Sequence, residues 1–344
     1  MTLNYIGETP AAAQNAGNKA RRDIDRIFAR RGYNLLENII ETRFGSTLDK
    51  INYVLKADTW KKIYRLCEVE GVDVIAQFPV YGNKLMRAAL KELFDCNSMI
   101  FVIHDLDALR NFAGRSTTEE IARLNSARLL IVHNKKMLDK LLELGVKTPM
   151  ISLELFDYLL DDTPPMPAVA NRNRIVFAGN LAKSKFLGSI KEIGIECALF
   201  GSDIDKNILS DNVSYNGSYT PEEIPHKLGN GFGLIWDGDS IETCSGSFGV
   251  YLKLNNPHKL SLYISAGLPV VTWTQAAIAD FVIDNGIGFT VESLRELPSA
   301  LKRITDDEYR SMLANSARIQ KDIIVGRFTE RALDRVEEIL SGGG

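Results

Sequence analysis

Short apolar runs alternate with amphipathic stretches along two long parts of this sequence, from Leu3 to Leu144 and from Arg174 to Ile324. A run such as Ser98–Ile103, flanked by helix-like segments, is typical of a strand buried on both faces of a parallel sheet. Parallel strands need helical crossovers between them. The pattern therefore predicts two α/β units, each with helices on both faces of its sheet.

A proline-rich segment separates the two units. Residues 161–167, DDTPPMP, combine three prolines with two acids, a composition that a packed helix or strand rarely tolerates. We place the boundary there, with one Rossmann-like domain over residues 1–160 and a second over 168–326. A helix expected over 327–340 is a candidate to pack back on the first domain. Ligands of open α/β folds bind at the carboxyl ends of strands, so we expect a cleft between the two sheets.

The amino-acid composition and net charge exclude several classes of function. The 344 residues are 45% hydrophobic and 25% charged, as in soluble globular proteins, and the net charge of −3 gives no reason to expect nucleic acid. No apolar run is long enough for a transmembrane segment, and the first residues lack the pattern of a signal peptide. Four scattered cysteines without a CxxC pair favour reduced thiols. We expect a cytoplasmic protein.

The polar turn before an apolar helix is the strongest candidate for a ligand site. It contains Asn255, Asn256 and Lys259, and its helix ends at Gly267 before a strand that Pro269 opens. Amide side chains, a lysine and the free N–H groups of a helix N-terminus suit a diphosphate. An ordinary solvated loop between helix and strand is the alternative that this stretch alone leaves open.

Two more loops of the second unit supply binding candidates. Gly179, after the strand predicted over Arg174–Ala178, lets the backbone approach a ligand, and Lys183 or Lys185 suits a phosphate. The spacing matches neither a P-loop nor a dinucleotide fingerprint, so a solvated loop stays open. Tyr219 precedes a helix predicted over 221–228, where it either stacks on a flat base or serves as a hydrophobic staple.

Acidic and glycine-rich residues follow the strand that ends near Trp236. Asp237 and Asp239 are candidate Mg²⁺ ligands, but acids in such a loop more often bind water or nearby backbone N–H groups, so we favour no metal site. The glycine-rich residues Ser245–Gly249 predict a mobile loop able to close over a ligand.

In the first unit, His104 and Asp105 follow a buried strand directly. A neighbouring imidazole and carboxylate form either a general base with its orienting group or a pair that grips sugar hydroxyls. A helix N-cap by Asp105 is the alternative. Asn15 lies near the first βα turn, where Rossmann-type domains present backbone to a ligand, and is a further binding candidate.

These motifs together resemble the GT-B class of nucleotide-sugar glycosyltransferases, two Rossmann-like domains facing each other across a cleft. Within it the chain is most similar to bacterial accessory glucosyltransferases, which extend O-linked GlcNAc on serine-rich repeat adhesins. The resemblance covers essentially the whole chain. It is carried most specifically by HDLDALR at 104–110, FAGNLAKSKFL at 177–187 and NNPHKLSLYISAGLPVV at 255–271.

The resemblance implies a division of labour between the domains. The C-terminal half would hold a UDP-sugar and the N-terminal half would present the acceptor. Lys183 and Lys185 would then meet the diphosphate and Tyr219 the uracil or ribose, while the phosphates and ribose fall to Asn255, Asn256 and Lys259. No metal cofactor is expected, because lysines and a helix N-terminus stabilise the departing UDP. The EX7E carboxylate pair of many retaining relatives has no clear match, which leaves the stereochemistry open.

The resemblance also implies an activity and an assembly. We expect glucose to move from UDP-glucose to a GlcNAc-modified Ser or Thr of an adhesin, in an enzyme that forms a homo-oligomer, a tetramer. Another UDP-sugar transferase, such as a galactosyl- or galactofuranosyltransferase, is the alternative. An epimerase using the same cleft and a non-catalytic scaffold of a glycosylation complex stay open as well.

Overall fold

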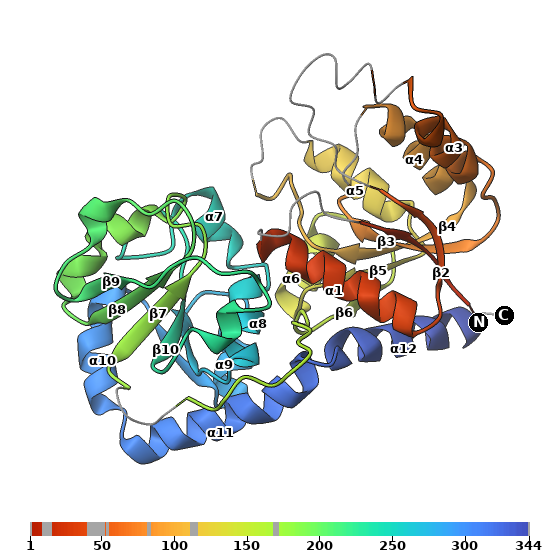
Figure 1. Cartoon of the computed structure of the whole chain (residues 1–344). Helices are drawn as coiled ribbons and strands as arrows, with labels where there is room; N and C mark the ends of the chain where they lie inside the picture. Colours follow the sequence, from red (N-terminus) through yellow and green to blue (C-terminus); the bar gives the residue numbers. More distant parts are fainter. Residues whose placement is uncertain are drawn as a thin grey trace.

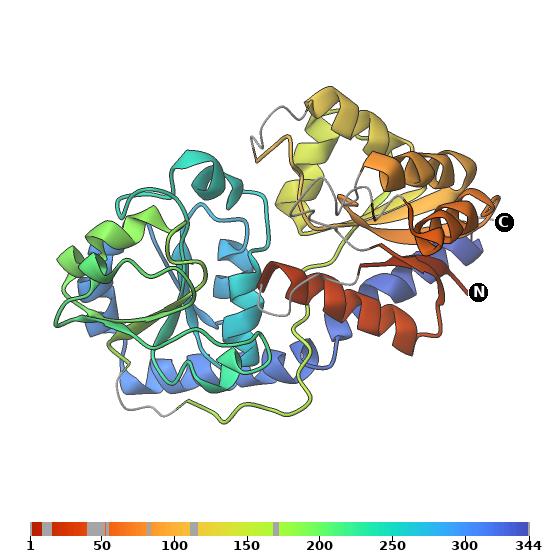
Figure 2. The same ribbon diagram turned by 45° about the horizontal axis from the view of Figure 1, so that its top comes forward.

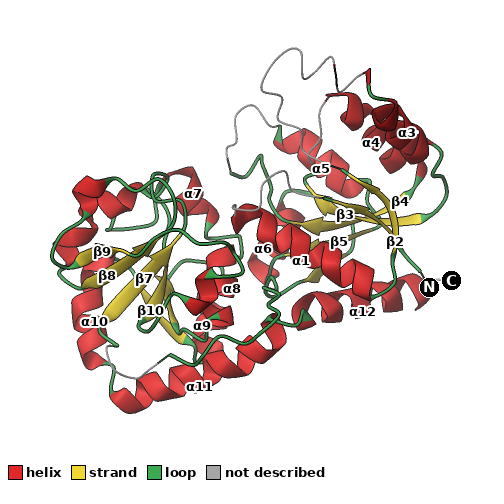
Figure 3. Cartoon of the chain, viewed as in Figure 1, coloured by secondary structure: helices red, strands yellow, loops and turns green. Residues whose placement is uncertain are grey.

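The computed structural model describes residues 2–8, 16–39, 52, 55–80, 84–110, 116–167 and 172–342. It contains two six-stranded parallel sheets side by side, each the centre of one domain (Figure 1). Strand order is β2-β1-β3-β4-β5-β6 in the first sheet and β12-β11-β10-β7-β8-β9 in the second. Helices lie on both sides of each sheet (Figure 3). The chain thus has the two-domain α/β architecture that the alternating pattern predicts.

The N-terminal domain is built by the first half of the chain. Its strands are β1 (Asn4–Gly7), β2 (Asn34–Asn38), β3 (Asp73–Phe78), β4 (Ser98–Ile103), β5 (Leu129–Val132) and β6 (Met150–Ser152). Its helices are α1 (Ala16–Arg30), α3 (Ala57–Cys67), α4 (Lys84–Cys96), α5 (Thr117–Asn125) and α6 (Lys135–Glu143). Strand β4 has the bounds expected from its apolar run. Helix α5 begins after Ser116, whose side chain accepts a hydrogen bond from Glu119 N–H.

The C-terminal domain combines short helices with one long helix, α11. Its strands are β7 (Arg174–Ala178), β8 (Glu196–Phe200), β9 (Val213–Tyr215), β10 (Phe232–Ile235), β11 (Val270–Trp273) and β12 (Gly288–Val291). Its α-helices are α7 (Gly246–Tyr251), α8 (His258–Ser265), α9 (Ala279–Asp284), α10 (Leu297–Arg303) and α11 (Asp306–Ile323). Short 3₁₀ segments include η1 (Lys185–Ile193) and η3 (Ile224–His226). None of the helices within the described ranges has the length and apolar character needed to cross a membrane.

The last helix, α12 (Arg327–Gly342), returns to the N-terminal domain (Figure 2). Its apolar face, with Leu333 and Val336, is buried in one cluster with Ile27 and Phe28 of α1. Asp157, just before the linker, accepts hydrogen bonds from the backbone N–H groups of residues 328 and 329 at 3.2 and 2.7 Å. A buried carboxylate therefore satisfies the N-terminus of the helix that crosses between the domains.

Two local predictions are wrong. Residues 246–249, expected in a mobile loop, form the first turn of α7, because Tyr251 at its end is buried in the N-terminal core cluster. The helix expected over 221–228 is only the 3₁₀ turn η3. Thr220 and Glu223 do form the reciprocal cap that the sequence indicates, but no longer helix follows them.

Candidate active site

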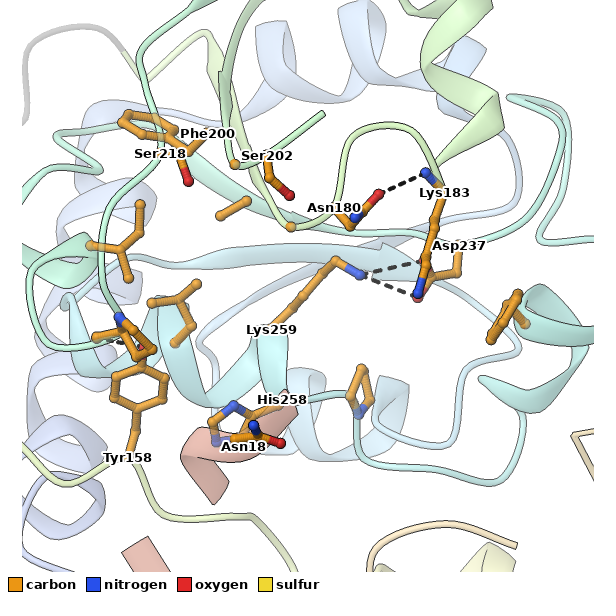
Figure 4. A pocket seen from close by; sticks show the side chains of 18 of the residues that line it. Asn18, Tyr158, Asn180, Lys183, Phe200, Ser202, Ser218, Asp237, His258 and Lys259 are labelled. Atoms are coloured by element: carbon orange, nitrogen blue, oxygen red, sulfur yellow. Dashed lines mark hydrogen bonds and ion pairs between the residues drawn. The ribbon is translucent and has the colours of Figure 1, made fainter. Parts of the chain in front are cut away.

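A cleft of about 610 Å³ lies between the two domains and takes its lining from both. The C-terminal domain contributes the loops after β7, β8, β9 and β10 together with α7 and the N-terminus of α8. The N-terminal domain contributes the loop after β4, one residue of α1 and Tyr158. The polar side chains that line it are Asn18, Asp105, Arg110, Tyr158, Asn180, Lys183, Ser202, Ser218, Tyr219, Asp237, Tyr251, Asn255, His258 and Lys259. Figure 4 shows the C-terminal wall of this cleft.

The N-terminus of α8 opens into the cleft. Pro257 occupies the cap position with an extended backbone and makes no side-chain cap hydrogen bond, and Pro257, His258 and Lys259 all line the cleft. The first N–H groups of the helix therefore stay available to an anion, where the helix dipole is positive. The Lys259 side chain starts in the first turn of this helix, and its Nζ lies 5.3 Å from the Phe177 ring centroid.

Two glycines keep the strand-end loops of this wall close together. Gly201 has a φ of +138°, and a Cβ there would lie 1.7 Å from the carbonyl oxygen of Gly179. No side chain fits at position 201, so backbone lines the cleft here. Beyond Gly179, the Asn180 side chain accepts a hydrogen bond from Lys183 N–H at 3.0 Å, which fixes the loop that carries the lysine (Figure 4).

An aromatic pair lies at the far end of the C-terminal wall. The rings of Tyr219 and Phe200 are tilted against each other with centroids 6.4 Å apart, and Tyr219 remains 38% exposed. Ser202 and Ser218 line the cleft beside them (Figure 4). A half-exposed ring with hydroxyl groups around it suits a flat, polar ligand such as a nucleobase.

On the opposite wall, Asp105 and Arg110 form an ion pair with a distance of 2.6 Å between Oδ2 and Nη1. The Arg110 guanidinium also lies over two rings of α7, 5.5 Å from the centroid of Phe248 and 5.7 Å from that of Tyr251. Burial raises the pKa of Asp105, while the nearby Arg110 opposes that shift. The hydroxyl of Tyr251 accepts from Leu106 N–H at 3.0 Å, so α7 is bonded to the loop that carries both charges.

His104 does not line the cleft. Its Nε2 is 2.6 Å from Oε1 of Gln77, and its ring stacks on Phe156 with centroids 5.1 Å apart. The Gln77 amide nitrogen donates to Asp25 and to a backbone oxygen, so Oε1 is the acceptor and His104 Nε2 carries the proton. Burial lowers the pKa of His104 well below its usual value. The imidazole is a neutral, oriented neighbour of Asp105.

Both halves of the chain match one protein family. Residues 3–155 match the N-terminal domain, and residues 175–336 the C-terminal domain, of the family described as glucosyltransferase 3-like. The β-1,6-galactofuranosyltransferase WbbI of Escherichia coli K12 is 32% identical over 97% of this chain and 98% of its own. The chain belongs to this family. It is a glycosyltransferase with the GT-B fold.

More distant relatives agree with that assignment. Glucosyltransferase 3 of Streptococcus gordonii is 25% identical over 99% of this chain and 100% of its own. The fold is also that of an E. coli trehalose-6-phosphate protein solved with UDP-2-fluoro glucose. That likeness has a TM-score of 0.55 and 11% identity, and it covers 96% of this chain and 98% of the other.

The structure brings most of the candidate residues of this glycosyltransferase into one cleft and places others elsewhere. Gly179, Lys183, Tyr219, Asn255, Lys259 and Asp105 line the cleft. Lys185 does not; it is largely exposed and lies 3.5 Å from Asp239. Asn15 lies outside the described residues.

Asn256 belongs to the junction between the domains. It is only 4% exposed, and its backbone N–H donates to Nδ1 of His133 at 2.8 Å. Its side chain accepts from Asn134 at 2.7 Å and donates to two backbone oxygens of the N-terminal half. Its neighbour Asn255 lines the cleft instead, with a buried Oδ1 that has no hydrogen-bond partner within the described ranges.

Lysine side chains pair with both acids of the candidate metal loop. Nζ of Lys259 is 3.3 and 3.4 Å from the two carboxylate oxygens of Asp237, and Asp239 pairs with Lys185. Among the residues that the structure describes, no group of three His, Cys, Asp or Glu side chains is arranged to hold a metal ion. Cations of the chain itself already occupy the places next to these carboxylates.

Several cleft residues had no clear signal in the sequence, among them Asn18, Tyr158, Phe248 and His258. Asn18 lies inside helix α1, and Tyr158 lies shortly before the linker. Neither the spacing nor the composition of these segments identifies the two residues as ligand-binding candidates. Phe248 and His258 belong to segments that were singled out, but only the fold of α7 and α8 brings their rings into the cleft.

Proposed function

We propose that this protein transfers a hexosyl group from a UDP-sugar to a hydroxyl group of a saccharide acceptor. The observation that carries the proposal is the open N-terminus of α8 with Lys259 above it, facing the same cleft as Tyr219. Helix N–H groups and an ammonium group suit a diphosphate, and the aromatic end suits a uracil ring. UDP in a protein of the same fold, at 11% identity, is consistent with this donor.

In this proposal, lysines and backbone stabilise the leaving group. The bond between the sugar C1 and the β-phosphate oxygen breaks, and its electron pair leaves with UDP. Lys259, Lys183 and the N–H groups at the start of α8 face the growing negative charge. No metal is required, since the cations next to Asp237 and Asp239 are lysines.

The acceptor side of the proposal rests on Asp105. The acceptor hydroxyl gives its proton to this carboxylate while its oxygen forms the new bond to C1. Asp105 lines the cleft on the wall opposite to Lys259, and burial raises its pKa toward the range useful for a base. His104 acts as a positioning residue behind it, held in one tautomer by Gln77.

We also propose which sugar is transferred and which acceptor receives it, and there are two candidates. The first candidate is transfer of glucose from UDP-glucose to a GlcNAc-modified Ser or Thr of a serine-rich repeat adhesin by a cytoplasmic homotetramer. The family description and the name of the streptococcal relative support glucose as the transferred sugar. The acceptor, the location and the assembly follow only from the resemblance. A second candidate is galactofuranosyl transfer to a saccharide, which is favoured by the higher identity, 32%, to the E. coli enzyme of that name.

Two measurements test these proposals. Calorimetric titration of UDP into the protein in EDTA should give a single site, and affinity that disappears on chelation would exclude the metal-free mechanism. UDP release should then be followed with UDP-glucose, UDP-galactose and UDP-galactofuranose, with and without a GlcNAc-serine peptide. Stimulation by the peptide with UDP-glucose alone supports the first candidate, while turnover of UDP-galactofuranose alone supports the second.

A further inference from the structure

Where the cleft borders the N-terminal domain, an exposed aromatic ring lies next to an ion pair. Phe248, on the short helix α7, is 50% exposed, although it lines the cleft. Arg110 lies 5.5 Å from its ring centroid and is paired with Asp105. The side chains of Arg110 and Asp105 are 21% and 30% exposed. This end therefore offers an apolar face, a partly exposed arginine side chain and a carboxylate.

This end of the cleft differs in net charge from the end proposed to bind the diphosphate. Arg110 and Asp105 together carry no net charge, and the Asp105 carboxylate repels a phosphate, which Lys183 and Lys259 attract on the other wall. A neutral ligand with hydroxyl groups and one apolar face fits here. Sugar rings have that character, because their C–H groups gather on one face and their hydroxyl groups lie around the edge.

We propose that Phe248, Arg110 and Asp105 form the acceptor-sugar subsite, with the C–H face of the acceptor ring on Phe248 and its hydroxyl groups next to the Arg110–Asp105 ion pair. This inference rests on the proposed glycosyl transfer and names a specificity residue for it. Phe248 belongs to the C-terminal domain, whereas its two partners belong to the N-terminal domain. The subsite therefore exists only while the two domains are docked.

Contacts of helix α7 with the N-terminal domain hold the two domains together at this end of the cleft. The Tyr251 hydroxyl accepts from Leu106 N–H, and the Tyr251 ring is buried in the N-terminal core cluster. Phe248 lies one helical turn before Tyr251, so anchoring one ring holds the other at the cleft. The acceptor is thus recognised by both domains, not by the N-terminal half alone.

The test compares Phe248→Ala with Val250→Ala, a control on the same helix. Val250 is 54% exposed and does not line the cleft. We expect Phe248→Ala to raise KM for the acceptor by about 10-fold, the upper range for one ring contact, with UDP affinity within about twofold of the parent. Phe248→Trp should recover most of the loss, and Val250→Ala should leave both constants unchanged. The acceptor probes are a GlcNAc-serine peptide and methyl glycosides of GlcNAc, glucose and galactose.

A readout independent of turnover uses saturation-transfer NMR on the same probes with UDP bound. Ring protons of the bound probe should receive saturation in the parent and lose most of it in Phe248→Ala. Equal acceptor KM and equal transfer in Phe248→Ala and Val250→Ala would overturn the subsite, as would a parent that binds UDP but none of the probes. A parent that binds no UDP contradicts the proposed function instead, so the two failures are distinguishable.

Discussion

Replacing Lys259 with Ala is the sharpest test of the phosphate site. The Lys259 side chain is 21% exposed and its Nζ lies 3.3 Å from Asp237, itself 27% exposed. An ion pair this close to solvent contributes at most about 1 kcal/mol to the free energy of unfolding. A charge-assisted hydrogen bond to phosphate is worth about 1.5–3 kcal/mol. UDP affinity should therefore fall by roughly 10- to 150-fold, while the unfolding midpoint changes little.

Lys185→Ala is the matched control. It removes the same charge from another basic segment of the same domain, the start of η1, but Lys185 is 72% exposed, pairs with Asp239 and does not line the cleft. Its UDP affinity, measured by calorimetry in EDTA, should stay within about twofold of the parent, because exposed charges at a distance are screened. Urea unfolding of both variants gives the stability comparison.

Two results would refute this reasoning. One is equal UDP affinity in the Lys259 and Lys185 variants. The other is full recovery of affinity when Asp237→Asn is added to Lys259→Ala, since the loss would then come from an unpaired carboxylate repelling the diphosphate. Partial recovery is expected, because the double variant still lacks the cation.

Three further predictions concern other parts of the molecule. The side chains of Lys19 and Asp23 are only 1% and 2% exposed, so Lys19→Met leaves a buried carboxylate without its cation. This change should lower the free energy of unfolding, measured in urea, by about 3–5 kcal/mol. Adding Asp23→Asn should recover part of that loss. Asp105→Asn should slow transfer to acceptor by about 100-fold or more at unchanged UDP affinity, measured by single-turnover kinetics. Burial lowers the pKa of His133 and of His258 to about 4, so the unfolded chain takes up protons that the folded chain excludes. Each histidine should therefore reduce stability as pH falls from about 6.5 to 4, by up to about 1.4 kcal/mol per pH unit, and NMR titration of their ring protons should give midpoints near 4.

The order of strands and helices follows from the sequence wherever an element is long and apolar. Strands β4 and β7 and helix α5 have the predicted bounds, since each has a complete apolar run or a side-chain cap. Strands β6 and β9, of three residues each, were missed because so short a run has no period of its own. Their positions are decided by pairing with the neighbouring strand of the sheet.

Helix α7 was missed for a related reason. Glycine and serine in residues 245–249 favour a loop locally, yet burial of Tyr251 against the other domain stabilises a helix. No local pattern contains that contact, because its partner, Leu106, lies far away in the chain. The position of Phe248 in the cleft depends on this contact, which is why this aromatic residue was absent from the sequence-based candidates.

The polar turn before α8 shows that the sequence of a loop does not reveal which of its polar side chains face the cleft. Asn255, Asn256 and Lys259 are equally polar in the sequence, but successive side chains leave the backbone in different directions. Asn255 and Lys259 line the cleft, whereas Asn256 fills its hydrogen bonds with His133, Asn134 and a backbone oxygen of the linker approach. A buried amide with these partners holds the two domains together, since breaking its bonds leaves unpaired polar groups out of water. The turn therefore places its cleft-lining lysine by bonding its own middle residue to the opposite domain.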